Sequence, residues 1–190
     1  MLEAIAGIVA HSGDVSLGPV PLDREARQPH VHYVPARSRA FDDATVAHML
    51  AFVAASVRAH PGAVGDVVPK LTLGDLGDRR LRTLVAGERK RAQLAAALLV
   101  PSGTLLIDEP FAGLEVRAAR AVADIFRTAT NERRTLLLAL SSPSSDEKLC
   151  DRFTLLSNGR VVGRGQIHEL REAARAHPGA SLDEVMHALA

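Results

Sequence analysis

Two adjacent carboxylates at the end of an apolar run are the side chains with the clearest chemistry. The segment Leu105–Pro110 reads LLIDEP, so Asp108 and Glu109 directly follow a pattern typical of a buried strand. Ligands of parallel sheets bind beyond the carboxyl ends of the strands. Asp108 is suited to a hydrated Mg²⁺, which takes only one or two protein carboxylates, and Glu109 to a water that attacks a phosphate. Taken alone, the hexapeptide fits an ordinary acidic loop equally well.

The surrounding pattern predicts an α/β fold. Short strands are expected at His30–Val34, Thr104–Ile107 and Thr135–Leu140, and the apolar runs of the last two indicate a parallel sheet covered on both faces. Asn158-Gly159 predicts a hairpin between Phe153–Ser157 and Arg160–Gly163, and the Gly- and Pro-rich stretch Pro61–Gly77 is expected to be a loop. Helices are expected at Met1–Val9, Thr45–Arg58, Glu88–Val100, Arg117–Thr128, Gln166–Ala176 and Leu182–Leu189.

Composition excludes several classes of protein. The chain has 190 residues, of which 47% are hydrophobic and 24% charged, as in a folded single domain. A net charge of +1 and the absence of Trp argue against nucleic acid as a partner. One cysteine, Cys150, excludes a disulfide framework. No apolar run approaches a membrane span, and no basic residue precedes Arg24 as in a signal peptide, so a cytoplasmic protein is expected.

Several short motifs resemble, in order, those of the nucleotide-binding domain of ATP-binding-cassette (ABC) transporters. Leu84–Glu88 (LVAGE) resembles the signature LSGGQ or LSGGE, Asp108–Pro110 the end of the Walker B strand, and Phe111–Glu115 (FAGLE) the D-loop. The resemblance extends over almost the whole chain: Leu2–Gly7 is similar to the helix after the P-loop, Ser12–Leu17 to the SGEV strand, Tyr33–Pro35 to the start of the Q-loop, and Leu182–Leu189 to the tail of drug-exporter ATPases.

The resemblance implies a P-loop NTPase-like parallel sheet, with helices on both faces and a small helical subdomain at about residues 40–85 of a single domain 1–190. It assigns catalysis to Glu109 and water-mediated Mg²⁺ contact to Asp108. ATP and Mg²⁺ are the expected cofactors, and a second ATPase subunit and a membrane permease the expected partners, which places the protein at the inner face of the membrane. By the same resemblance, ATP held by the opposite subunit is contacted by Leu84, Val85, Ala86, Gly87 and Glu88, and the D-loop contributes Gly113, Leu114 and Glu115.

The family's phosphate-binding sequence G-x-x-x-x-G-K-[ST] does not occur in these 190 residues. The three lysines, Lys70, Lys90 and Lys148, lie in other contexts and are expected to be solvated surface charges. By resemblance, Met1 falls just after the P-loop, so the fold is expected to be incomplete at its N-terminus. The strands Thr135–Leu140 and Phe153–Ser157 would then lack the strand they share in the family. Either another segment fills this gap or the protein starts further upstream.

Five aligned positions depart from the family pattern. Ala36 stands at the Q-loop glutamine, Val85 at the signature serine, Ala86 at the first signature glycine, Ser141 at the switch histidine and Glu115 at the D-loop aspartate. Valine cannot cap a helix or bond a phosphate, and serine cannot carry a histidine's positive charge.

Three hypotheses follow. The first is the ATPase subunit of an ABC transporter, truncated or degenerate, that does not hydrolyse ATP alone. The second is a non-catalytic pseudo-ATPase module that binds a second ATPase or a permease. The third is a small α/β binding protein that carries the DEP sequence by chance. Whether the chain is an enzyme at all is left open by the sequence.

Overall fold

The computed structural model describes residues 1–141 and 147–190 and divides into two compact units, Met1–Ala139 and Leu140–Ala190. Each unit is described by itself. The first holds a parallel sheet with helices packed on it, so the predicted α/β class is confirmed.

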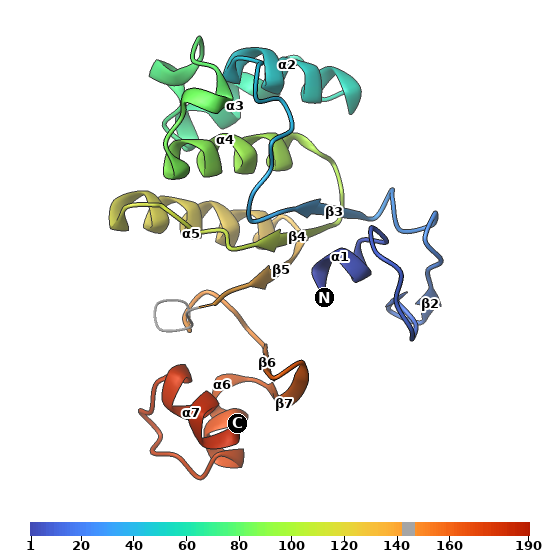
Figure 1. Ribbon diagram of the computed structural model, residues 1–190, viewed down its shortest axis with the longest axis vertical. Coiled ribbons are helices and arrows are strands. Elements are labelled where there is room, and N and C mark those ends of the chain that lie inside the picture. The colour runs from blue at the N-terminus through green and yellow to red at the C-terminus, as the bar shows by residue number, and fades with distance from the viewer. Residues whose placement is uncertain (142–146) are drawn as a thin grey trace. The chain divides into compact units, whose positions relative to one another are not determined.

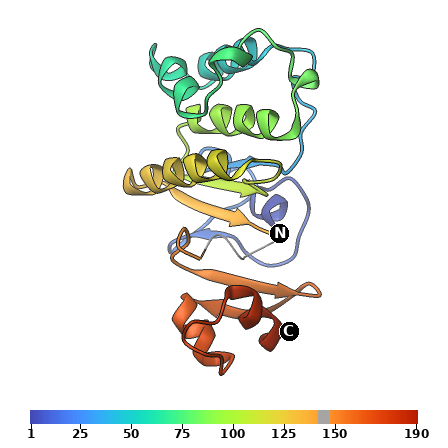
Figure 2. The same ribbon diagram turned by 90° about the vertical axis from the view of Figure 1, so that its left-hand side faces the viewer.

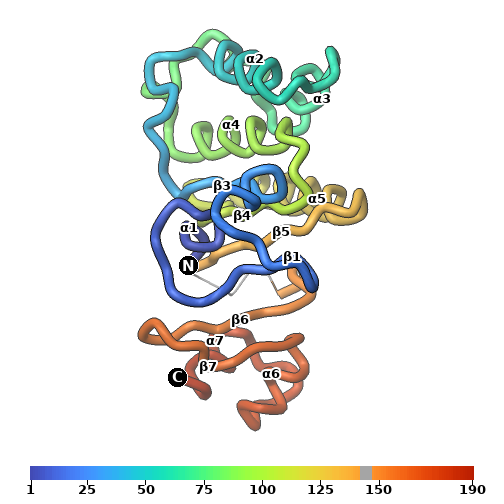
Figure 3. The backbone as a smooth tube through the Cα atoms, turned by 90° about the vertical axis from the view of Figure 1, so that its right-hand side faces the viewer, coloured from blue at the N-terminus to red at the C-terminus, as the bar shows by residue number. Residues whose placement is uncertain are grey.

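The sheet of the first unit positions the candidate site. Its strands β3 (Val31–Val34), β4 (Thr104–Asp108) and β5 (Thr135–Ala139) are parallel and lie in the order β3-β4-β5. The central strand β4 is fully buried at Leu105, Leu106 and Ile107, as its unbroken apolar sequence requires. All three strands run the same way, so the residues that follow them gather at one edge (Figure 3).

Helices cover this sheet in a layered arrangement. Helix α4 (Ala86–Leu99) lies between the strands and the two helices α2 (Val46–Ser56) and α3 (Ala63–Lys70), as Figure 1 shows. Helix α5 (Val116–Asn131) packs beside β5, and the strands can be followed next to it in Figure 2. Two short 3₁₀ helices, Gly74–Leu76 and Leu81–Thr83, connect α3 to α4.

The expectation of a loop over Pro61–Gly77 is wrong, because α3 forms inside it. Ala63 and Val67 are buried, and α3 packs against α4. Burial of this face outweighs the poor helix propensity of Gly65 and Pro69.

The expected N-terminal helix is also shorter than predicted. Helix α1 covers only Leu2–Ile5, because Gly7 adopts a φ of +75° that ends it. The strand expected over Ser12–Leu17 is reduced to β1 (Ser16–Leu17), which pairs antiparallel with β2 (Val20–Pro21).

Strand β5 is less buried than its sequence predicts. Within the described residues it pairs with β4 along one edge only, and no strand lies against the other. Thr135 is exposed and the Leu137 side chain is 36% exposed. The described residues therefore place no hydrogen-bonded strand on this edge of β5.

The second unit combines a hairpin with two helices. Strands β6 (Phe153–Ser157) and β7 (Arg160–Gly165) pair antiparallel through Asn158-Gly159, and both turn residues have positive φ, which confirms the predicted hairpin. Helices α6 (Ile167–Ala173) and α7 (Leu182–Leu189) pack on β7. Their shared core is formed by Leu155, Leu170, Ala180, Leu182 and Val185.

Candidate functional site

Asp108 and Glu109 lie at the carboxyl edge of the sheet, as predicted from the sequence. Asp108 is the last residue of β4, and the Glu109 amide donates to the Ala139 carbonyl at the end of β5 over 2.9 Å. Glu109 also adopts a φ of +48°, a left-handed conformation that costs a non-glycine residue about 1–3 kcal/mol. Both side chains are partly buried. The strained turn fixes the direction in which the chain leaves the strand after its two carboxylates.

The loop after Glu109 contacts the start of helix α4 through two glycines. A Cβ atom built on Gly87 would lie 2.4 Å from the Gly113 carbonyl oxygen, and one built on Gly113 would lie 2.9 Å from the Cβ of Ala86. Gly113 also needs its φ of +74°. The structure thus brings together two motifs that the sequence separates by more than twenty residues, and it explains why both positions are glycine.

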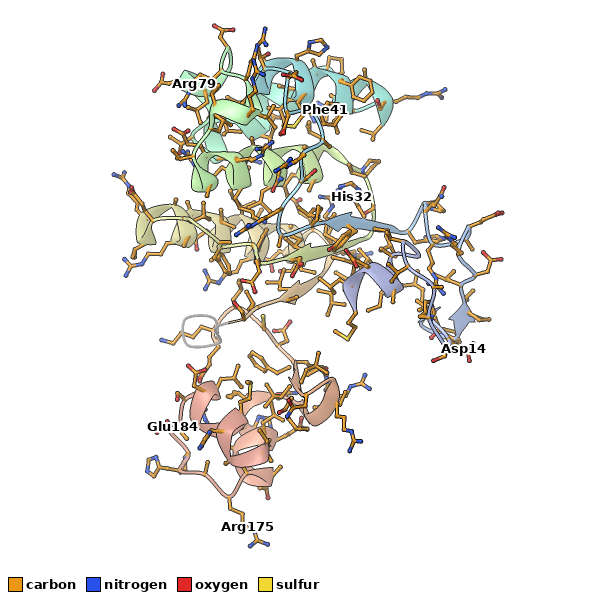
Figure 4. All side chains as sticks on the ribbon, in the orientation of Figure 1. Asp14, His32, Phe41, Arg79, Arg175 and Glu184 are labelled. Carbon is orange, nitrogen blue, oxygen red and sulfur yellow. The ribbon has the colours of Figure 1, made fainter. Side chains whose placement is uncertain are left out.

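Helix α4 begins at an exposed and only partly capped end. The N-cap residue Val85 is 65% exposed and offers no side-chain acceptor to the first turn. Glu88 supplies one of the two hydrogen bonds of a capping box, because its carboxylate accepts from the Val85 amide at 3.1 Å. The same carboxylate bonds Arg79, whose guanidinium also donates to the Thr83 carbonyl. Arg79 is labelled in Figure 4.

The prediction that Lys90 is a surface charge is wrong. Lys90 is 2% exposed, and its ammonium donates to the carbonyl oxygens of Pro35, Ala36 and Asp108 at 3.3, 3.0 and 3.2 Å. The sequence did contain a signal, because Lys90 shares a helix face with Leu94 and Ala97, both buried. Lys70 and Lys148 are exposed, as predicted.

Charge and burial oppose one another around the edge of β4. Burial lowers the pKa of Lys90, although the negative charges of Asp108 and Glu109 act in the other direction. Burial also raises the pKa of Tyr33 on β3, and the charges of Asp108 and Glu3 add to this effect. A buried cation and two carboxylates therefore occupy one edge of the sheet.

The remaining predicted site residues have the following places. Ala36 lies in the bend after β3, and its carbonyl is held by Lys90. Leu84 is buried and Ala86 exposed, while Leu114 is half-buried and Glu115 is the exposed N-cap of α5. Ser141 is exposed and belongs to the second unit. Positions 142–146, which follow Ser141, lie outside the described residues.

A metal ion at this edge would need ligands besides the two carboxylates. Within residues 1–141 and 147–190, no three His, Cys, Asp or Glu residues are grouped for metal binding. Mg²⁺ needs only one or two protein carboxylates when a nucleotide supplies phosphate oxygens, so Asp108 fits as one contact of such an ion. The described helices include none that is long and apolar enough to cross a membrane.

Comparison with known proteins gives consistent matches. Residues 1–112 match the ABC transporter family. ABC transporter G family member 8 of Arabidopsis thaliana is 32% identical over 84% of this chain and 28% of its own length. The daunorubicin/doxorubicin resistance ATP-binding protein DrrA of Streptomyces peucetius is 33% identical over 57% of this chain and 33% of its own. This chain thus matches about a third or less of the length of these relatives.

A solved structure, the ATP-binding subunit of an ABC transporter, superposes with a TM-score of 0.87 at 22% identity over 99% of this chain and 81% of its own. This similarity concerns the fold. Together with the family match over residues 1–112, it leads to one conclusion. The chain belongs to the ABC transporter family and has the fold of its ATP-binding subunits.

Proposed function

We propose that this chain is an ATPase-like subunit of an ABC transporter that does not hydrolyse ATP by itself. The observation that carries the proposal is the close approach of Gly87 and Gly113, which joins the start of α4 to the loop after Asp108 and Glu109. In this proposal, the contact connects the residues that would handle water to the helix end that would face a phosphate. The lysine and glycines that would grip the phosphates do not occur in the 190 residues.

In this function each part of the edge has its own task. Glu109 orients the attacking water, and Asp108 makes a water-mediated contact to Mg²⁺. The start of α4 presents main-chain N–H groups and the positive end of the helix dipole to ATP held by a second subunit. ATP, when bound there, supplies the phosphoryl group and the remaining Mg²⁺ ligands.

In this proposal a second subunit brings its own phosphate-binding loop. The test is to purify this chain together with a complete ABC ATPase subunit and measure ATP turnover of the assembly. We expect turnover that requires the partner's loop and that falls at least tenfold in Glu109→Gln of this chain. Failure to form any assembly would count against the proposal.

A non-catalytic partner is the second candidate, and the start of α4 favours it. Val85 occupies the N-cap position of α4 and is 65% exposed, but its apolar side chain offers a second subunit's nucleotide no hydroxyl. Ala36 supplies only main-chain atoms where the family has an amide. Such a module would still be needed for assembly, but Glu109→Gln would leave the turnover of the assembly unchanged.

We infer that the permease docks beside the loop that follows β3. There Phe41 and Phe52 are 39% and 53% exposed, and their rings pack with centroids 5.4 Å apart. Figure 4 labels Phe41 on this side of the helical layer. Phe41 also lines an apolar pocket, together with Tyr33, Met49 and Val53. Exposed aromatic side chains next to an apolar pocket are typical of a protein interface, and this contact would hold the chain at the inner face of the membrane.

A further inference from the structure

A buried ammonium joins the helical layer to the ends of two strands. The Nζ of Lys90, on α4, donates to Pro35 and Ala36 just after β3 and to Asp108 at the end of β4, with all three distances between 3.0 and 3.3 Å. An ammonium has three N–H donors, so each is used.

Packing alone does not account for a lysine at this position. Burying a cation is costly, and an apolar side chain of the same volume fills a core at lower cost. The three acceptors are main-chain carbonyls where the strands end and the loops begin, which are the carbonyls that lose ladder partners. The Lys90 ammonium, on α4, donates hydrogen bonds to these carbonyls and fixes their distance from the helix.

We propose that Lys90 is a positioning residue that locks the loop after β3 and the main chain at Asp108 to helix α4, so that the start of α4 and the two carboxylates move as one body. The role of this lock in ATP hydrolysis rests on the proposed function. The lock itself is independent of that function, because its three hydrogen bonds lie within the first unit and involve no nucleotide.

The experiment compares hydrogen exchange in the full chain and in three variants, without nucleotide. Lys90→Met keeps the volume and removes every donor, Lys90→Gln keeps two amide donors without the charge, and Lys70→Met removes an exposed lysine of the same unit as the matched control. Three amides around the lock, those of Asp42, Glu109 and Ala112, donate to main-chain oxygens and report on it.

In Lys90→Met we expect these amides to exchange about tenfold faster or more, while the Met49 and Leu73 amides, in and next to the helical layer, change little. Lys90→Gln should restore most of the protection, and Lys70→Met should leave all five amides unchanged. In the unmodified chain, the Lys90 ammonium protons should exchange with water more slowly than those of Lys70.

Two results would overturn the proposal. If Lys90→Met accelerates all five amides by one factor, Lys90 is only a source of global stability. If Lys90→Gln protects no better than Lys90→Met, its donors do not matter. Should Lys90→Met fail to fold, the Lys90→Gln variant and the ammonium exchange rate of the unmodified chain still decide the question. Failure of ATP turnover in an assembly would leave these results untouched, since no nucleotide is present.

Discussion

Gly87 and Gly113 approach so closely that neither has room for a side chain. The atom that a methyl group on Gly87 would meet at 2.4 Å is the main-chain oxygen of Gly113, which cannot rotate away. The first residue lies in the first turn of α4 and the second in the loop after the carboxylates. The contact ties the signature-like helix to the edge of the sheet.

Replacing Gly87 by alanine should therefore force one of these segments to move. We expect Gly87→Ala to lower the free energy of unfolding by about 1–3 kcal/mol, measured by urea denaturation. Gly65→Ala is the matched control, because Gly65 also lies in a helix but has open space around it. It should be neutral or stabilise by up to about 1 kcal/mol. Equal effects of the two substitutions would contradict the role given to the contact.

The exposed aromatic pair provides a test of the inferred permease surface. Phe52→Ser should leave the unfolding midpoint nearly unchanged, because the side chain is already 53% exposed, but it should reduce co-purification with the permease. Val116→Ser, at a 71% exposed position on α5, is the control and should not affect binding. Loss of binding in the control alone would place the interface elsewhere.

In the second unit, the Glu147 carboxylate forms hydrogen bonds to residues of both helices, α6 and α7. It accepts from the Leu182 amide at the start of α7 over 2.6 Å and pairs with Arg171 of α6 at 2.8 Å. Glu147→Gln should destabilise this unit by about 1–2 kcal/mol, seen as faster hydrogen exchange in α7 but not in α4. Glu172→Gln removes the charge of an exposed α6 glutamate and should change little.

The cap of α7 gives a pH dependence with a definite sign. Hydrogen bonds from the Ser181 amide and then its hydroxyl lower the pKa of Glu184 below its ordinary value of 4.5. As the pH falls, the unfolded chain therefore binds a proton at Glu184 before the folded chain does. The stabilisation by this cap is complete above pH 4.5 and is lost as the pH falls through the lowered pKa of Glu184 in the folded chain. Glu184→Gln should remove this part of the acid dependence, measured by exchange of α7 amides. An unchanged acid profile in that variant would contradict the assignment.

Much of the fold follows from local patterns in the sequence. The apolar run of β4 and the turn at Asn158-Gly159 each specify their structure within a few residues, and both predictions are confirmed. Helix α3 could not be predicted in this way, because only its packing on α4 compensates for Gly65 and Pro69.

The candidate site is predictable to the extent that its residues are neighbours in sequence. Asp108 and Glu109 follow directly from the strand pattern. The contact between Gly87 and Gly113 depends on the tertiary arrangement of α4 and the loop. The surface prediction for Lys90 is wrong because it rested on the lysine's lying outside the phosphate-binding motif and not on its helix face, which is apolar. A charged side chain is expected to be exposed only where it has no unpaired main-chain carbonyl oxygens within hydrogen-bonding distance.

The central proposal is that these 190 residues carry carboxylates that would handle water but do not bind and turn over ATP alone. The most direct measurement is Mg-ATP hydrolysis by the purified chain, with Glu109→Gln prepared in parallel. The account predicts that the two proteins show the same rate, at the background of the assay. Hydrolysis by the unmodified chain that disappears in Glu109→Gln would contradict it.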